Sequence, residues 1–150
     1  LINPECAVNI IDDCISPDNQ AEYLNRGYDY VIDAIDNVKI KAAMIAYCKR
    51  NKIKIITIGG AGGQTDPTKI QIADLSKTIQ DPLLAKVRSV LRKFAVDAVF
   101  SSQPLIFPKM GEGCEVSATM NCANGFGAAT MITATFGFFA VSRVIDKLLK

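Results

Sequence analysis

The 150-residue sequence contains no histidine. A catalytic triad built on histidine and a histidine-ligated zinc site are therefore excluded within this chain. Its five cysteines form no CxxC pair, so the paired-cysteine zinc motif is missing as well. An odd number of cysteines without a paired motif indicates a reducing compartment. We therefore expect a cytoplasmic protein whose cysteines are mostly buried. They are Cys6, Cys14, Cys48, Cys114 and Cys122.

A glycine-rich phosphate loop of the GxGxxG type is also missing. The glycine cluster at 59–63 follows a predicted strand, but it continues into QTDPTK, which does not begin a helix. A nicotinamide-dependent dehydrogenase is therefore disfavoured, because it needs such a loop to hold the pyrophosphate of its cofactor. The net charge of +2 is too small to indicate nucleic-acid binding by itself.

The elements that are present predict an α/β fold. Hydrophobic residues make up 49% of the chain, enough for the core of one domain. Apolar runs predict three strands, separated by helices that end near Leu24 and Arg50, and this βαβαβ order is typical of a parallel sheet. Residues 69–73 alternate between apolar and polar side chains and predict an antiparallel continuation. The predicted strands are 7–11, 30–35, 54–58, 69–73 and 95–100, and the later helices are 82–92 and 126–149.

Residues 122–142 carry no charged side chain. The run is long enough to span a bilayer, but glycine, asparagine and hydroxyl side chains interrupt it. Its small residues would let another helix approach closely. We therefore predict that 126–149 is a long apolar helix, buried or at a homodimer interface. Membrane contact through 122–142, with a membrane-associated location, is the alternative.

An acidic turn follows the predicted strand at 30–35. Asp33 and Asp36 lie at its carboxyl end, and Asn37 is placed to cap the helix 38–50. Ligands of open parallel α/β sheets bind at this edge. We predict that Asp36 holds Mg²⁺ on a nucleotide phosphate and that Lys41, one turn further on, reaches the same anion. A cap that only starts the helix is the alternative.

The pattern D-N-x-x-x-K after an apolar strand resembles the E1-like adenylating superfamily of ubiquitin-activating enzymes and molybdopterin- and thiamine-biosynthesis adenylyltransferases. The segments 59–88 and 121–142, with INPEC at 2–6 and SPDN at 16–19, are similar to its tRNA threonylcarbamoyladenosine dehydratase branch. The resemblance implies a Rossmann-like E1-type sheet, with Asp36 and Asn37 at the magnesium–ATP site. Lys41 stands where the family usually has arginine, so a phosphate contact there would be a point charge.

The resemblance also implies an activity. ATP adenylates the carboxylate of N6-threonylcarbamoyladenosine at tRNA position 37, and intramolecular attack then closes a ring with loss of AMP. The implied cofactors are ATP and Mg²⁺, with a monovalent cation left open. One alternative is a sulfur-carrier-protein adenylyltransferase, whose CxxC zinc ligands are absent here. The other is an interaction module that docks a cysteine desulfurase or its sulfur acceptor.

Family members carry their nucleotide loop before an INPEC-like segment, so we expect this chain to be the C-terminal part of one adenylating domain. Two junctions, 93–94 and 119–120, have almost no turn residues, and we expect missing loops there that border the active site. The glycine-rich segment is predicted to face the substrate, with a strand-ending turn as the alternative: Gly59, Gly60, Gly62, Gly63 and Asp66. A basic cluster is predicted to contact tRNA phosphates: Lys86, Arg88, Arg92 and Lys93.

Overall fold

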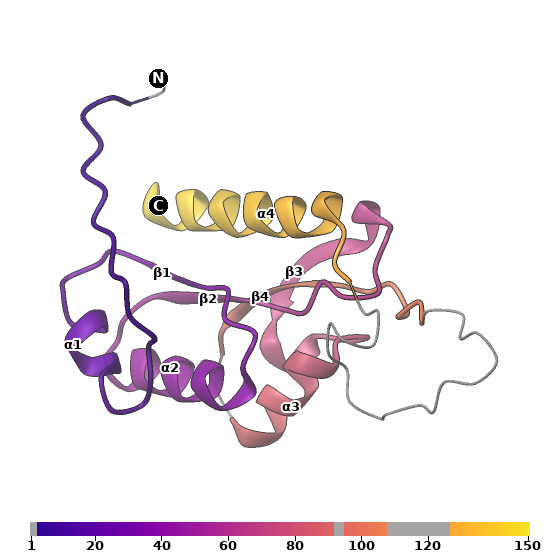
Figure 1. Ribbon diagram of the computed structural model, residues 1–150, viewed down its shortest axis with the longest axis horizontal. Helices are drawn as coiled ribbons and strands as arrows, with labels where there is room; N and C mark the ends of the chain where they lie inside the picture. The colour runs from indigo at the N-terminus through magenta and orange to yellow at the C-terminus, as the bar shows by residue number, and fades with distance from the viewer. Residues whose placement is uncertain (1–2, 92–94, 108–126) are drawn as a thin grey trace.

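The computed structural model describes residues 3–91, 95–107 and 127–150. Its centre is a four-stranded sheet in the order β1-β2-β4-β3 (Figure 1). β1, β2 and β4 are mutually parallel, and β3 runs antiparallel to β4. The predicted α/β fold, with a parallel portion continued by an antiparallel strand, is confirmed. The strands are Val31–Asp33 (β1), Ile55–Ile58 (β2), Ile70–Asp74 (β3) and Asp97–Ser101 (β4).

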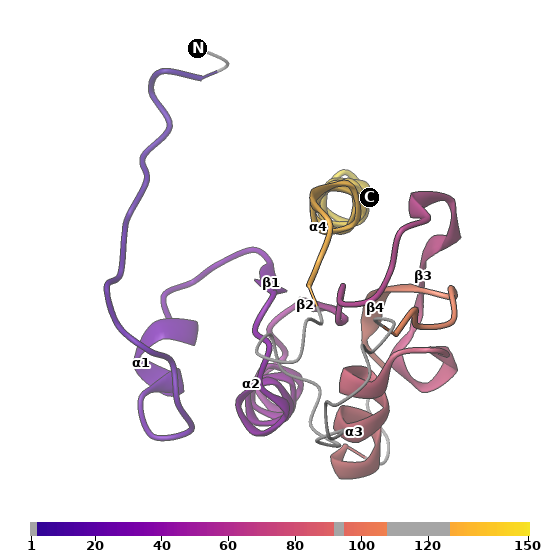
Figure 2. The same ribbon diagram turned by 45° about the vertical axis from the view of Figure 1, so that its right-hand side comes forward.

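Helices cover both faces of the sheet. Figures 1 and 2 show α1, α2 and α3 on one face and α4 across the other. Each face therefore has its own hydrophobic cluster, one formed with α2 and α3 and the other under α4. β2 is buried on both faces, which is typical of a continuous apolar run in a parallel sheet. The helices are Gln20–Leu24 (α1), Val38–Arg50 (α2), Pro82–Val90 (α3) and Thr130–Leu148 (α4), with 3₁₀ turns at Pro67–Lys69 (η1) and Leu75–Lys77 (η2).

Local signals explain where the best-predicted helices begin. The side chain of Asn37 accepts a hydrogen bond from the Ile40 amide at 3.1 Å, and α2 has the predicted bounds. Asp81 caps α3 in the same way, followed by proline at the first helical position. The buried side chains of α2, from Ala42 to Cys48, face the sheet at helical spacing.

The predicted strand at 7–11 is wrong. Residues 3–14 are irregular and exposed, with Val8 76% and Ile10 88% accessible to solvent. No strand of the described chain lies beside this segment to form a hydrogen-bonded ladder, so its apolar residues do not make it a strand. In both ribbon views the segment leads away from the sheet toward the N-terminus.

The prediction of a long, wholly apolar C-terminal helix is also wrong. α4 runs from Thr130 to Leu148, and Phe126 lies outside the described residues. The helix is amphipathic, because one stripe packs on the sheet while the other faces carry both apolar and charged side chains. Within the described ranges, no helix is long and apolar enough to cross a bilayer. The buried stripe consists of Ile132, Phe136, Ala140 and Val144.

Candidate active site

A cleft of about 770 Å³ lies beside the carboxyl ends of β1 and β2. Its walls come from the loop between β1 and α2, from residues 58–62, from the start of α3 and from α4. Ligand sites of open α/β sheets are expected at this edge, where strand ends and helix N-termini converge. The volume is in the range of pockets that hold a nucleotide-sized molecule.

Asp36 and Asn37 both line this cleft, as the sequence predicted. Asn37 is occupied as the cap of α2, whereas the Asp36 side chain is exposed. The described residues contain no group of three or more acidic or cysteine side chains that would hold a metal alone. Mg²⁺ on a nucleotide needs only one or two carboxylates, because phosphates and water supply its other ligands. Asp36 therefore fits a metal shared with the ligand.

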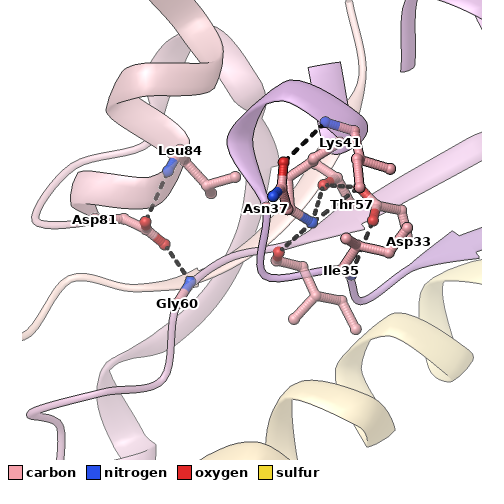
Figure 3. Close-up of polar contacts among 10 residues, drawn as sticks. Asp33, Ile35, Asn37, Lys41, Thr57, Gly60, Asp81 and Leu84 are labelled. Carbon is pink, nitrogen blue, oxygen red and sulfur yellow. Dashed lines mark hydrogen bonds and ion pairs between the residues drawn. The ribbon is translucent and has the colours of Figure 1, made fainter. Parts of the chain in front are cut away.

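Lys41 does not reach the cleft. Its ammonium is fully buried and donates to Asp33 Oδ2 at 2.8 Å, to Thr57 Oγ1 at 3.1 Å and to the Ile58 carbonyl at 3.0 Å (Figure 3). These bonds use all three N–H donors of the side chain. The geometry therefore contradicts the predicted contact between Lys41 and a phosphate. Instead, Lys41 ties the start of α2 to the ends of β1 and β2.

Charge is balanced inside this network. Asp33 is 1% exposed and also accepts hydrogen bonds from the Thr57 hydroxyl at 2.7 Å and the Ile35 amide at 3.0 Å. Burial lowers the pKa of the Lys41 ammonium, while the carboxylates of Asp33, Asp81 and Asp36 act in the opposite direction. The buried cation thus compensates the acidic residues around the strand ends.

Asp81, the cap of α3, is a second buried acidic residue at the cleft. Its Oδ1 accepts from the Leu84 amide at 2.9 Å, and its Oδ2 accepts from the Gly60 amide at 3.0 Å (Figure 3). Burial raises its pKa, and the two amide bonds and the charge of Lys41 partly offset that shift. No local signal predicts the bond to Gly60, which lies 21 residues away in sequence.

The glycine loop, residues 59–63, is only partly a wall of the cleft. Gly59, Gly60 and Gly62 line it, whereas Gly63 is not among the lining residues and has a positive φ of 68°. Asp66 is not among them either. Its carboxylate accepts from the Thr68 amide at 2.9 Å and caps η1. The structure thus brings three of the five predicted substrate-facing residues to the cleft.

The structure brings only part of the basic cluster predicted to contact tRNA to the cleft. Lys86 lines the cleft. Arg88 instead donates to the carbonyl of Thr78 at 2.9 Å and to its hydroxyl. Arg92 and Lys93 lie outside the described residues. Lys86 is therefore the member of this cluster that the structure brings to the candidate site.

The cysteines of the described chain offer no activated thiol at this site. Cys48 is fully buried, as predicted, and burial raises its pKa to about 11, so its thiol stays protonated at neutral pH. Cys6 and Cys14 are exposed, contrary to the expectation of mostly buried thiols. Cys114 and Cys122 lie outside the described residues.

Comparison with known proteins identifies the family. A model of the ThiF family matches residues 1–150. This chain belongs to the ThiF family. The tRNA threonylcarbamoyladenosine dehydratase of Haemophilus influenzae is 82% identical over 100% of this chain and 62% of the relative. Its Escherichia coli namesake is 55% identical over 99% of this chain and 62% of the relative. The resemblance stated from the sequence is confirmed.

Solved structures agree with this assignment. Crystal structures of the E. coli tRNA N6-threonylcarbamoyladenosine dehydratase in complex with ATP and with AMP match at a TM-score of 0.85 and 53% identity. Each match covers 99% of this chain and 59% of the solved one. The chain therefore spans less than two thirds of the relatives it matches, and its place in their C-terminal part stays a prediction.

The two predicted missing loops lie outside the described residues. The matched stretch of the Haemophilus relative is 161 residues long, against 150 residues here. That relative thus has additional residues inside the matched region. Missing residues at 93–94 and 119–120 stay a prediction.

Proposed function

We propose that this chain belongs to an ATP-dependent, E1-like enzyme that adenylates and cyclises N6-threonylcarbamoyladenosine at tRNA position 37. One observation carries the proposal. An exposed aspartate at the start of α2 faces a nucleotide-sized cleft, in a chain 53% identical to a dehydratase solved with ATP and AMP. A cytoplasmic location is part of the proposal, and a tRNA substrate supports it.

The family resemblance implies the chemistry of the reaction. The substrate carboxylate attacks the α-phosphorus of ATP and pyrophosphate leaves. The tethered carbamoyl group then attacks the activated carbonyl carbon, AMP leaves, and the net change is loss of water. Asp36 would hold Mg²⁺, which offsets phosphate charge as the first bond breaks. The second step profits from a nucleophile in the same molecule, so it needs no enzyme thiol.

Contact with tRNA is proposed for Lys86. It is exposed, lies one turn into α3 and lines the cleft, so its ammonium is placed to meet a phosphate near the reacting nucleoside. A monovalent cation and a cysteine desulfurase or sulfur-acceptor partner are further parts of the proposal, implied by the family resemblance alone.

The test uses the full-length protein, ATP, Mg²⁺ and tRNA that carries N6-threonylcarbamoyladenosine. We expect AMP and pyrophosphate to form together with a nucleoside lighter by one water, detected by mass spectrometry after digestion. Unmodified tRNA is the control and should give no AMP. AMP formation that requires a sulfur-carrier protein and leaves the nucleoside unchanged would favour the alternative adenylyltransferase.

A homodimer is proposed from the outer face of α4. Phe138 is 74% exposed, and further apolar side chains along the helix and at its C-cap are between 47% and 82% exposed, namely Met131, Val141, Ile145, Leu148 and Leu149. An apolar face of this extent is usually covered. Phe138→Asp should therefore convert dimers of the full-length protein to monomers in light scattering, whereas Phe138→Leu should not. A wild-type monomer would contradict the proposal.

A further inference from the structure

One carboxylate joins two walls of the cleft. Asp81 is 3% exposed and belongs to the start of α3. Its Oδ2 accepts from the Gly60 amide and its Oδ1 from the Leu84 amide, so the glycine loop after β2 is tied to the first turn of α3 (Figure 3). The preceding amide, of Gly59, donates to the Val99 carbonyl of β4 at 2.8 Å. The loop is thus held from both sides.

Asp81 also explains why residue 59 is glycine. A Cβ at this position would lie 1.9 Å from Asp81 Oδ2 and 3.1 Å from Leu84 Cδ1. Neither neighbour is free to move, because the carboxylate holds two amides and Leu84 is fully buried. Gly59 does not have a positive φ, so the requirement is steric and not conformational.

The next residue provides a contrast. A Cβ on Gly60 would lie 3.8 Å from Leu83 Cβ and 3.9 Å from Asp81 Oδ1, which are ordinary contacts. Gly60 does not have a positive φ either. Of two adjacent glycines in the cleft wall, therefore, only the first is incompatible with a methyl group.

We propose that Asp81 is a positioning residue for the reaction. Its two hydrogen bonds, to the Gly60 and Leu84 amides, tie the glycine loop to α3 and are called the Asp81 strap. The strap fixes a wall of the same cleft that Asp36 lines. The catalytic part of this inference rests on the proposed function, whereas the strap itself rests only on the contacts above. A misplaced wall would leave ATP bound but hold the reacting groups in poor geometry.

The strap is tested first without any assay of activity. In thermal melts of the full-length protein, Gly59→Ala should lower the midpoint by more than about 4 °C, and Gly60→Ala should change it by less than about 2 °C. Asp81→Ser keeps a helix cap but is too short to reach Gly60. In the Asp81→Ser variant, adding Gly59→Ala should lower the melting midpoint much less than it does in the wild type, because the clashing carboxylate oxygen is gone. If Gly59→Ala lowered the melting midpoint equally in the wild type and in Asp81→Ser, the proposed strap would be wrong.

The positioning role is tested with the folded variants and the tRNA substrate. Asp81→Ser should lower kcat for AMP formation about tenfold to a hundredfold with little change in KM for ATP. The matched control is Asp74→Ser, which removes the carboxylate that caps η2 away from the cleft and should keep wild-type kcat. Wild-type kcat in Asp81→Ser would overturn the positioning role. If the wild-type enzyme forms no AMP, the proposed function is wrong. The thermal melts then still test whether the Asp81 strap exists.

Discussion

Replacing Lys41 by methionine is expected to lower the free energy of unfolding by about 3–5 kcal/mol. Methionine replaces the side chain as far as Cε but lacks the ammonium that neutralises Asp33. Both side chains are 0% exposed, so the remaining carboxylate would be buried without a compensating charge. Urea unfolding of the wild-type and variant proteins measures the difference.

Two further variants separate the lost charge from lost packing. Asp33→Asn combined with Lys41→Met removes both charges, and we expect it to recover most of the stability lost by Lys41→Met alone. Lys49→Met, an exposed position on the same helix, should stay within about 0.5 kcal/mol of wild type. A double variant as unstable as Lys41→Met would show that packing, and not the unpaired Asp33, dominates.

Asp36→Asn is expected to reduce AMP formation at least about 100-fold, because a metal on the phosphates contributes several kcal/mol to the transition state. Asp36 is exposed in the cleft, so the melting temperature should hardly change. The measurement is chromatographic detection of AMP from full-length enzyme, ATP and modified tRNA.

Asp29→Asn is the matched control for this substitution. Asp29 is an exposed aspartate before β1, at the opposite end of the strand from Asp36, and it does not line the cleft. It should therefore show wild-type AMP formation. Normal AMP formation by Asp36→Asn would remove Asp36 from the metal site, whereas a large loss in both variants would indicate a general effect of charge.

The beginnings of helices and the placement of Asp36 were predictable because their causes are local. A cap needs an acceptor and an amide three residues apart, and Asn37 with Ile40 and Asp81 with Leu84 supply such pairs within one turn. Helical and strand periodicities likewise need only neighbouring residues. The mixed sheet and its ligand edge then followed from the order of the elements.

The roles of Lys41 and of the segment 7–11 were decided by tertiary contacts. A lysine on a helix is usually solvated, and Lys41 is buried only because Asp33 and Thr57 meet it from strands 8 and 16 residues away in the sequence. Residues 7–11 have strand-like composition but lack a neighbouring strand in the described structure.

By itself, the sequence determined the α/β class, where α2 and α3 begin and which aspartate lies at the ligand edge, because short-range hydrogen bonds and periodic burial decide these features. Only the tertiary structure decided that Lys41 is a buried counter-ion, that Asp81 accepts a hydrogen bond from the Gly60 amide and that Gly59 has no room for a side chain. These contacts join segments that meet only when the sheet is assembled, and the energy of a buried charge or a steric clash depends on every neighbour the fold brings to it.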